Sequence, residues 1–363
     1  MALLGLLAAL GLGAHLLSCL AVALRLRRPA PLATGDLPRV ALLRPVCGLD
    51  RFDGETLLSS FHQDHPDHEV VFCAAREDDA AVPLVRALIA AHPGVRARLL
   101  VGDDRISGNP KLDNLAKGVA ATDAPWLVMA DSNLLLPPDY LRRLQGAWAP
   151  GVGLVSSPPI GTRPQGLWGA LECAILNTNQ ARLQLLADSL GMGFAQGKTL
   201  AWRRDDLLAV GGLPALGARL AEDAAATIAV RARGLRVRLT QRPFEQPIGA
   251  RTLAAVWARQ LRWSKVRRDA FPGLFLLEPF NGAALPSLAL LLSGLPVAWL
   301  LPFLALWFGA EAALAARARW PMGPLSILAL PLRDLLLPAL WLATFGSRGF
   351  TWRGTAMGAR PAA

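Results

Sequence analysis

The sequence predicts an α/β fold, in which a parallel sheet is combined with helices that cross a membrane. Two observations support this prediction. Short apolar runs alternate with segments of helical periodicity through the middle of the chain, and strands that alternate with helices form parallel sheets. In addition, the 363 residues are 53% apolar, and the apolar residues concentrate near both ends. The stretches there are long enough to cross a bilayer core of about 30 Å as helices.

The first apolar stretch covers residues 2–24, which include no Asp, Glu, Lys or Arg. No basic residue precedes it, whereas Arg25, Arg27 and Arg28 follow it. This distribution is not typical of a cleaved signal peptide, and by the positive-inside rule it indicates an outside N-terminus. We therefore predict a transmembrane helix over residues 1–27 and a cytoplasmic location for the segment that follows.

Two more apolar stretches predict transmembrane helices over residues 283–309 and 321–346. The second stretch is interrupted only by Arg333 and Asp334. Adjacent opposite charges at membrane depth are costly unless they are neutralised locally or face protein or water. Three crossings from an outside start place the C-terminus in the cytoplasm, in agreement with the arginines that follow the last stretch. These arginines are Arg348 and Arg353.

Strands and helices alternate in the segment between these ends, residues 38–270. Strands are predicted at 40–43, 70–75, 95–101 and 126–130, and helices at 54–62, 80–91, 112–120 and 138–148. The last strand is apolar throughout, which is typical of a central strand buried on both faces. It ends at Asp131, and ligands of open α/β sheets bind beyond the carboxyl ends of the strands. Asp131 is therefore predicted to meet a nucleotide or a metal ion, although Asp131-Ser132 would also suit a simple turn.

Acidic residues close two of the predicted strands, with Asp78 and Asp79 after the second and Asp131 after the fourth. A nucleoside diphosphate needs its charge offset, and Mg²⁺ or Mn²⁺ take carboxylate oxygens, so Asp131 is the candidate metal ligand. Asn133 could add a neutral oxygen. Lys111 begins a predicted helix, next to a candidate phosphate position. The chain has neither Gly-x-x-x-x-Gly-Lys-Ser/Thr nor Gly-x-Gly-x-x-Gly, so the sequence favours neither a P-loop ATPase nor a dinucleotide-binding enzyme.

Glu222 and Asp223 precede a predicted helix over residues 224–233. Two interpretations are open. The two acids could complement the positive end of the helix dipole. Alternatively, Asp223 could act as a general base, because a carboxylate beside an acceptor can remove the proton of a hydroxyl as the new bond forms.

A basic and aromatic motif lies on a predicted helix over residues 252–268. Arg259 and Arg262 are three residues apart, hence on one face, and could bind phosphate or carboxylate while Trp263 packs nearby. A basic helix at the membrane interface would explain the two arginines equally well. It would not explain why the aspartates and this motif occur in one chain.

The composition and spacing of the residues argue against a nucleic-acid-binding protein, cysteine-based zinc or redox chemistry, and a histidine metal site. The formal net charge is +11, but the arginines lie mainly beside the apolar segments and along 231–268, as expected for a domain that rests on anionic lipid and not for one that binds nucleic acid. The four cysteines include no Cys-x-x-Cys pair that would suggest zinc or redox chemistry. His62, His65 and His68 are spaced by three, but Pro66 interrupts a helix there, which favours a solvated helix end over a metal site.

Taken in order, the motifs resemble those of membrane-bound GT-A glycosyltransferases that use nucleotide sugars, and among these the ceramide glucosyltransferase family. The resemblance covers most of residues 40–280. The motifs that carry it are Asp78-Asp79, Asn109-Pro110-Lys111 with Asn114-Leu115, Asp131-Ser132-Asn133, Ala221-Glu222-Asp223, and Arg259-x-x-Arg262-Trp263. Each motif alone is weak, but together in this order they are specific. The chain departs from the family at Asn133, where Gly or Asp is usual, and at Asn179, where family members carry His.

The resemblance implies a Rossmann-like GT-A nucleotide-sugar domain over 38–270, between N-terminal and C-terminal transmembrane helices. It also implies a UDP-sugar donor, a divalent cation (Mg²⁺ or Mn²⁺), and inverting transfer of a hexose to the primary hydroxyl of a membrane lipid. Glucose is the first candidate for the sugar and ceramide for the acceptor, with a hopanoid or another lipid alcohol as the alternative acceptor. The protein would be a multi-pass enzyme of the inner (cytoplasmic) membrane whose catalytic domain faces the cytoplasm.

Two other functions are less consistent with these residues. A processive polysaccharide synthase shares the aspartates, but typically has Gln at the place of Arg259 and more membrane helices. A membrane protein that binds sugar without catalysis would not need Asp131 and Asp223 together.

The resemblance also implies a role for each motif. Asp78 or Asp79 would bind the nucleoside, Lys111 would contribute to the nucleotide site, and Asp131 would bind the metal and diphosphate. Asp223 would take the acceptor proton. The leaving diphosphate would be bound, and the acceptor entrance formed, by Arg259, Arg262 and Trp263.

Residues 271–282 follow the arginine motif and are too short and too broken to span a membrane. We predict that they lie in the membrane interface as an apolar shelf, which would admit a two-chain lipid, with Phe271 and Phe275 in contact with it.

Overall fold

The computed structural model describes residues 1–219, 221–346, 349–352 and 355–357. These residues form two compact units. The helical unit contains Met1–Arg28, Ile160–Leu186 and the described residues from Ile248 to Gly346; the sheet unit contains Pro29–Pro159 and Ala187–Pro247, with the β10–β11 hairpin (Phe350–Trp352 and Thr355–Met357). Arg348 and Arg353, which supported the predicted location of the C-terminus, lie outside the described residues.

The sheet unit is built on a seven-stranded sheet with the order β3-β2-β1-β4-β7-β5-β8. The strands are β1 (Val40–Val46), β2 (His68–Ala74), β3 (Ala97–Val101), β4 (Trp126–Ala130), β5 (Val152–Ser156), β7 (Thr199–Arg203) and β8 (Arg236–Leu239). The pairs β1–β2, β2–β3, β1–β4 and β5–β8 are parallel. The predicted parallel sheet is therefore confirmed for the first four strands. The sequence did not predict β7, which runs antiparallel to both β4 and β5.

Helices follow the strands of this sheet as the alternating pattern predicts. They are α2 (Asp53–Leu58), η1 (Ser59–Phe61), α3 (Ala81–Ala91), α4 (Pro110–Ala120), α5 (Tyr140–Gly146), α8 (Arg204–Ala209), α9 (Gly212–Gly217) and α10 (Glu222–Ala232). Asn109 caps α4, since its side chain accepts hydrogen bonds from the backbone N–H groups of Lys111 and Leu112, and Pro110 occupies the first turn. The cap determines where α4 begins and thereby fixes the position of Lys111 in its first turn.

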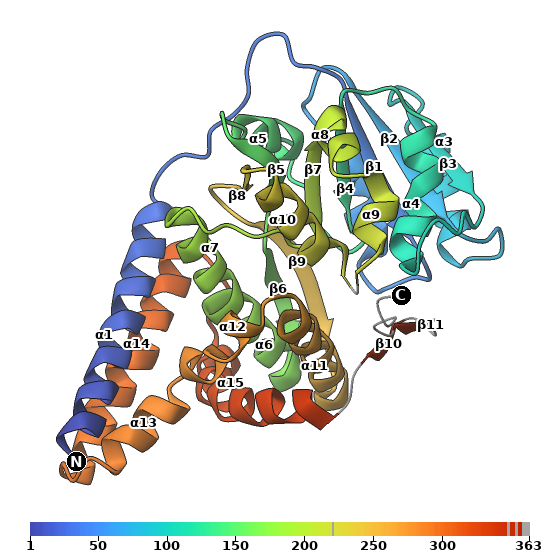
Figure 1. Cartoon of the computed structure of the whole chain (residues 1–363). Coiled ribbons are helices and arrows are strands. Elements are labelled where there is room, and N and C mark those ends of the chain that lie inside the picture. Colours follow the sequence, from blue (N-terminus) through green and yellow to red (C-terminus); the bar gives the residue numbers. More distant parts are fainter. Residues whose placement is uncertain (220, 347–348, 353–354, 358–363) are drawn as a thin grey trace. The chain divides into compact units, whose positions relative to one another are not determined.

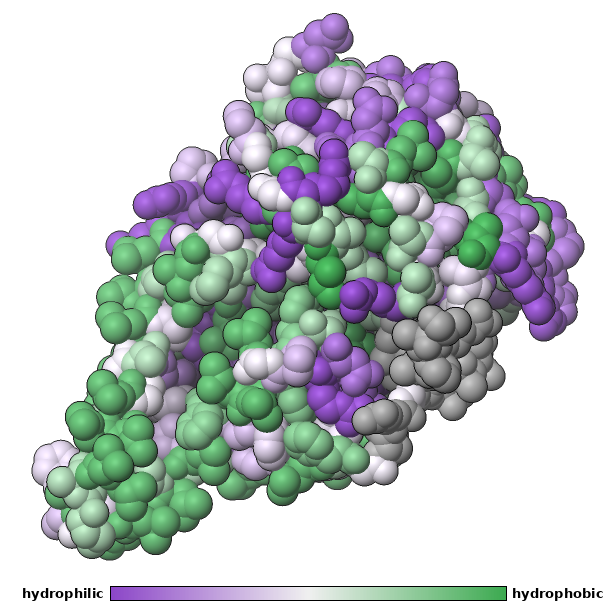
Figure 2. Space-filling model, viewed as in Figure 1, coloured by the Kyte–Doolittle hydropathy of each residue, from purple (hydrophilic) through white to green (hydrophobic). Residues whose placement is uncertain are grey.

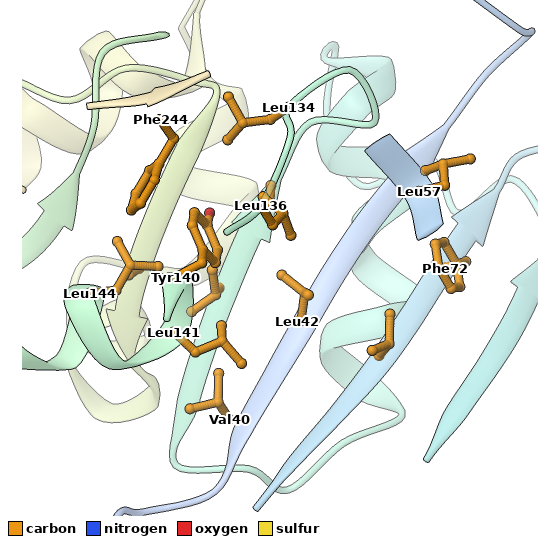
Figure 3. Close-up of a cluster of buried hydrophobic side chains, with 14 of the residues drawn as sticks. Val40, Leu42, Leu57, Phe72, Leu134, Leu136, Tyr140, Leu141, Leu144 and Phe244 are labelled. Carbon is orange, nitrogen blue, oxygen red and sulfur yellow. The ribbon is translucent and has the colours of Figure 1, made fainter. Parts of the chain in front are cut away.

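Both faces of the sheet are covered by apolar side chains. Val40 and Leu42 of β1 pack on one face with Tyr140 of α5 (Figure 3), whereas the intervening Ala41 and Leu43 pack on the other face. All five residues of β4 are buried, and they alternate in the same way between the two clusters. The prediction that 126–130 is a central strand is thus confirmed. Burial of one such large side chain contributes about 1.5–3 kcal/mol.

The helical unit contains the remaining elements. They are α1 (Ala2–Arg25), α6 (Gly166–Ala174), the π-helical turn η2 (Ile175–Ala181), the first part of α7 (Arg182–Ser189) up to Leu186, α11 (Leu253–Ala270), α12 (Pro272–Phe275), η3 (Glu278–Asn281), α13 (Ala284–Leu291), η4 (Val297–Trp299), α14 (Leu300–Ala318), α15 (Pro324–Ala343) and η5 (Thr344–Gly346). β6 (Pro159–Gln165) and β9 (Phe244–Ala250) form a separate two-stranded sheet.

The division of the chain differs from the continuous domain predicted over 38–270, because 160–186 and 248–270 belong to the helical unit. The reason is apolar packing. Leu171 of α6 and Val256 of α11 share one buried cluster with Leu330 of α15.

Three helices among the described residues are long and apolar enough to cross a membrane: Ala2–Arg25, Val297–Ala318 and Pro324–Gly346. In Figure 1, α1 lies along α14, and the two pack together through a cluster that contains Ala8 and Trp307. The surface over α1, α13 and α14 is mostly hydrophobic (Figure 2). Six leucines of α1 point outward, and the side chain of each is at least half exposed: Leu3, Leu6, Leu7, Leu10, Leu17 and Leu20.

The second long helix lies farther along the chain than the predicted span over 283–309. The structure ends α13 at Leu291 and starts a new helical segment at Val297. Gly294 adopts φ +79°, a left-handed conformation that ends a helix, and Pro296 has no N–H group to continue one. The helix that is long enough to span therefore includes Glu311, which lies beyond the predicted span over 283–309.

Glu311 is compatible with an apolar helix because it pairs with Arg333 of α15. The Arg333 guanidinium donates to both oxygens of Glu311, at 2.8 and 2.9 Å, and its Nε donates to Asp334 Oδ1 at 2.7 Å. Asp334 Oδ2 also accepts the backbone N–H of Ala283 at 2.7 Å. The local neutralisation that the sequence required for Arg333 and Asp334 is therefore present.

Candidate functional site

The site begins at the carboxyl end of β4. Because β4 and β7 are antiparallel, with Ala130 opposite Thr199, the residue after β4 lies beside the residue before β7. These residues are Asp131 and Lys198, and the backbone N–H of Asp131 donates to the carbonyl of Lys198 at 3.2 Å. Lys198 is not among the residues predicted from the sequence, since only the antiparallel pairing of β7 brings it to Asp131.

The Lys198 ammonium is held between two oxygens. Lys198 Nζ lies 2.8 Å from Asp131 Oδ2 and 2.8 Å from Asn133 Oδ1. The other oxygen of the carboxylate, Asp131 Oδ1, pairs with Lys111 Nζ at 2.7 Å. Burial opposes ionisation of Asp131, but these two ammonium groups hold the pKa of its carboxyl well below the ordinary value. Asp131 is therefore ionised at every pH at which the protein would work.

Lys111 joins the strand end to α10. Its Nζ donates to Glu222 Oε1 at 2.8 Å and to the carbonyl of Gly197, in addition to its pair with Asp131. Three acceptors match the three N–H groups of an ammonium. Burial opposes the charge, yet the carboxylates of Asp131 and Glu222 raise the pKa of Lys111 well above its ordinary value. Lys111 thus binds the parts of the site together, and its predicted contact with the nucleotide stays a prediction.

Asp223 is the second predicted functional carboxylate that lies here. Its Oδ2 accepts the backbone N–H of Gly197 at 2.9 Å, and its Oδ1 accepts the N–H of Ala224 at 2.7 Å. Burial, and next the negative charge of Glu222, raise the pKa of Asp223 to about 6. Of the two interpretations of Glu222 and Asp223, a helix-end role accounts for the bond to Ala224. A carboxyl group whose pKa lies close to neutrality also suits a general base, and this role stays a prediction.

Gly197 passes between these side chains and leaves no room for a side chain of its own. A Cβ at this position would lie 2.8 Å from Glu222 Oε1 and 3.4 Å from Asp223 Oδ2. Asn109 completes the site, because its Nδ2 donates to Glu222 Oε2 at 3.0 Å. We call the set Lys111, Asp131, Lys198, Glu222 and Asp223 the lysine–carboxylate cluster.

Asp78 and Asp79 lie outside this cluster and differ from each other. Asp79 accepts the backbone N–H of Gly48 at 2.9 and 3.0 Å, and that of Ala81 at 2.9 Å, so it ties the segment after β1 to the start of α3. Asp78 is exposed and pairs with Arg76, which lowers the pKa of the Asp78 carboxyl. Of the two aspartates of this predicted nucleoside motif, Asp79 is therefore the one held in place by backbone hydrogen bonds.

Arg259 and Trp263 lie one turn apart on α11 in the helical unit, together with Arg262. The Arg259 guanidinium stands over the Trp263 ring, 4.9 Å from its centroid, and Arg259 Nη1 lies 3.0 Å from Oε1 of the buried Glu172. The structure thus brings Arg259 and Trp263 together, as predicted. It adds Glu172 of α6, which the sequence did not single out.

The predicted interfacial shelf over 271–282 needs a correction at Phe275. This side chain is 1% exposed, and its ring stacks on Trp341 with 5.8 Å between centroids, so it belongs to the core of the helical unit. The short helix α12 turns the opposite side outward. The exposed apolar residues of the segment are Leu274, Leu276, Leu277 and Phe280, each 59–63% exposed.

His65 was predicted at a solvated helix end, and this was wrong. The side chain is buried and its Nε2 lies 2.9 Å from Gln145 Oε1. Among the described residues, no group of three or more His, Cys, Asp and Glu side chains could hold a metal ion.

The lysine–carboxylate cluster does not fit the divalent cation that the resemblance implies at Asp131. Mg²⁺ and Mn²⁺ prefer an octahedral set of oxygen ligands, with carboxylates among them. Here both oxygens of Asp131 and both oxygens of Glu222 are engaged by Lys111, Lys198 or Asn109. The end of β4 thus carries the ammonium groups of Lys111 and Lys198 beside the carboxylate of Asp131.

Comparisons with known proteins agree with the predicted resemblance. Ceramide glucosyltransferase 1 of Caenorhabditis elegans is 28% identical over 247 residues, which cover 68% of this chain and 53% of that protein. Ceramide glucosyltransferase 3 of the same organism is 24% identical over 331 residues, covering 88% and 72%. The chain thus spans about half the length of the first of these relatives.

The fold is similar to that of a mannosyltransferase from Pyrobaculum calidifontis, solved in complex with GDP-Man and Mn²⁺. The TM-score is 0.50 and the identity 20%, over 94% of this chain and 95% of that one, so the likeness shows a GT-A fold. The model of glycosyl transferase family 21 matches residues 3–362. Because this match covers almost the whole sequence, the chain belongs to glycosyl transferase family 21.

Proposed function

We propose that this chain transfers a hexose from a UDP-sugar to a hydroxyl group of a membrane lipid, with inversion at the sugar carbon. The observation that carries the proposal is the lysine–carboxylate cluster, which places a carboxyl group with a pKa of about 6 beside a cationic strand end. Family membership and the relatives that are named ceramide glucosyltransferases support the reaction class.

In this proposal Asp223 is the general base. The backbone N–H groups of Gly197 and Ala224 hold its carboxylate in place, and above pH about 6 it is ionised and able to accept a proton. The acceptor hydroxyl gives its proton to Asp223 as its oxygen forms the bond to the sugar carbon. The bond from that carbon to the diphosphate breaks on the opposite face, and its electron pair leaves with UDP.

The negative charge that develops on the leaving diphosphate needs a cationic partner. Lys198 would provide one at the end of β4, where Asn133 and Asp131 hold its ammonium in place. By resemblance, Arg259 and Arg262 would add to this role. Arg guanidinium groups suit it because they bind phosphate with paired N–H groups.

The acceptor is proposed to be a lipid because three helices of the described chain suit a membrane and an apolar segment follows the arginine motif. That segment, with Leu274 and Leu277 exposed, would hold the lipid chains near the bilayer. Ceramide is the first candidate, in view of the relatives' names, and a hopanoid or other lipid alcohol the second. A processive synthase fits less well, since Arg259 replaces its usual Gln.

The test uses the full chain in nanodiscs that contain ceramide, incubated with radiolabelled UDP-glucose, with UDP-galactose and a hopanoid alcohol in parallel. The expected product is a labelled glucosylceramide that the Asp223→Asn variant does not form. Labelling of the hopanoid alone would identify the hopanoid, and not ceramide, as the acceptor. Transfer to soluble sugars irrespective of lipid would contradict the proposal.

A further inference from the structure

We propose that this chain enters the lipid bilayer through α1 and a helical hairpin, formed by α13 and α14, that packs along α1. In this arrangement α14 crosses in the same direction as α1, and α15 lies along the cytoplasmic interface. The connection over residues 319–323 is then cytoplasmic, whereas the spans predicted over 283–309 and 321–346 would place it outside. All the contacts that support this arrangement lie within the helical unit.

The order of contacts along α1 and α14 shows that the two helices run in the same direction. Near the start of α1, a Cβ at Gly5 would lie 3.6 Å from Ser293 Cβ and 3.8 Å from Leu295 Cδ1. Farther along α1, His15 stacks on Trp307 with 3.8 Å between ring centroids, and its Nε2 lies 3.1 Å from the Trp307 carbonyl oxygen. Later positions of α1 thus meet later positions of α14.

α13 runs in the opposite direction and forms a hairpin with α14. A Cβ at Gly11 would lie 3.3 Å from Pro286, near the start of α13, whereas Gly294, which follows α13, lies against the Met1 side chain. Gly294 and Pro296 belong to the turn between α13 and α14, so this turn lies at the N-terminal end of α1 (Figure 1). The segment 279–296 therefore leads the chain outward, and α14 returns it.

The distribution of charge agrees with this hairpin. Residues 2–24 and 279–310 contain no Asp, Glu, Lys or Arg. Arginines stand at the ends of both long helices: Arg25, Arg27, Arg28, Arg317 and Arg319. Because parallel helices end on the same side, these arginines lie at one membrane surface, which the positive-inside rule and anionic headgroups identify as the cytoplasmic one. If α14 ran opposite to α1, the last two arginines would lie outside.

The surface of the hairpin is apolar, as contact with lipid chains requires. Its exposed large side chains are each at least 44% exposed: Leu288, Leu291, Leu292, Leu295, Val297, Trp299, Leu301 and Leu306. The hydrophobic surface over α1, α13 and α14 is continuous in Figure 2. The segment Val297–Ala318 has 22 residues. At 1.5 Å per residue it reaches about 33 Å, enough to cross a hydrocarbon core of about 30 Å.

α15 exposes a single apolar stripe and is covered by protein on the other side. Leu328, Leu335 and Leu342 recur every seven residues and are 55–71% exposed. The opposite side packs through Leu330 on α6 and α11 and carries the fully buried Arg333. A helix with one apolar stripe and a protein-covered back suits the plane of the membrane interface. With α1, the segment 279–296 and α14 as the three crossings, the chain after α14 stays on the cytoplasmic side.

The test is cysteine labelling of the full chain with a membrane-impermeant maleimide, in intact spheroplasts and in inverted membrane vesicles. Ala2→Cys and Gly323→Cys are made singly in a Cys47→Ser background, since Cys47 is exposed and the other three cysteines are buried. Gly323 is exposed, and a Cβ there would meet no atom within 4 Å, so the substitution fits.

The two cysteines are expected to react from opposite sides, Ala2→Cys in spheroplasts and Gly323→Cys only in inverted vesicles. Reaction of both from the same side would overturn the common direction of α1 and α14. Leu295→Cys, at the 50% exposed tip of the hairpin, should also react in spheroplasts. If it reacts from neither side, the turn stays inside the bilayer and the crossing by the hairpin is overturned.

A reporter fused after Gly349 tests the placement of α15. A cytoplasmic reporter together with a cytoplasmic Gly323→Cys supports an interfacial α15, whereas an external reporter would show that α15 crosses and overturn that placement. Cys47 in the otherwise unchanged chain is the reference for the side that follows α1, and a thermal melt in detergent verifies the folding of each variant. None of these measurements requires UDP or transfer, so their failure would leave the proposed function in place.

Discussion

Arg333 and Glu311 form a two-point ion pair, with N–O distances of 2.8 and 2.9 Å, and both side chains are fully buried among apolar helices. Removing one partner of a buried pair leaves the other charge uncompensated, which costs about 3–5 kcal/mol. Arg333→Leu is therefore expected to lower the free energy of unfolding by that amount, because both Glu311 and Asp334 lose their partner. Thermal unfolding in detergent measures the effect.

Arg317→Leu is the control for this substitution. Arg317 lies in the last turn of α14 and is exposed, so its replacement should change the stability by less than about 0.5 kcal/mol. Equal effects of the two substitutions would show that the buried pair has no special structural role.

Asp223 predicts an acid limb in the pH profile of transfer. A general base must be ionised, and burial raises the pKa of Asp223 to about 6, so kcat should fall as the pH decreases through about 6. Asp223→Asn should lower kcat by roughly 10² to 10⁴ and leave the affinity for UDP unchanged. A loss of UDP affinity instead would identify Asp223 as a binding residue, and an acid limb near the ordinary pKa of an aspartate would exclude it as the base.

The Arg259–Trp263 pair predicts that arginine and lysine are not equivalent at position 259. The guanidinium stacks on the indole ring and pairs with Glu172, and an ammonium cannot reproduce the planar stacking. Arg259→Lys should therefore lower kcat about tenfold with the charge retained. Arg267→Lys is the comparison on the same helix, since Arg267 pairs with Glu278, and it should have little effect on kcat. If Arg259→Lys is fully active, only the charge at this position matters.

The exposed apolar residues after α11 predict a selective effect on the lipid substrate. Leu274→Ser with Leu277→Ser should raise the KM for the lipid at least about threefold and leave the KM for UDP-sugar unchanged, because both side chains are exposed. Phe275→Ser should instead destabilise the protein by about 3–5 kcal/mol, since its buried ring packs on Trp341. A change in the UDP-sugar KM with the leucine variant would argue against a role in lipid binding.

The arginines that follow the first apolar helix predict its orientation. By the positive-inside rule, a reporter at the N-terminus should be outside and one fused after Gly349 should be cytoplasmic, with the sheet unit on the cytoplasmic side. Paired cytoplasmic and external reporters in cells measure both ends. Detection of both termini on the same side of the membrane would contradict the prediction that the chain crosses the membrane three times.

Local patterns determined much of this protein. The uninterrupted apolar run over β4 was sufficient to predict a strand buried on both faces and to place Asp131 at the edge where ligands bind. The helix start at Lys111 and the acidic start of α10 were likewise predicted, because helix ends and periodicity depend on neighbours in the sequence. The order of the motifs was enough to predict the family.

The tertiary structure decided which of these residues meet. Lys198 reaches Asp131 because β7 returns antiparallel beside β4, and no sequence spacing encodes that pairing. Glu311 lies beyond the predicted span over 283–309, but the helix break at Gly294 and Pro296 places it in the long helix, where it is buried and pairs with Arg333. Phe275 is buried by the packing of Trp341, 66 residues away along the chain. Each of these contacts joins segments that are distant in sequence, and such contacts depend on the packing of the whole fold rather than on any local preference of the chain.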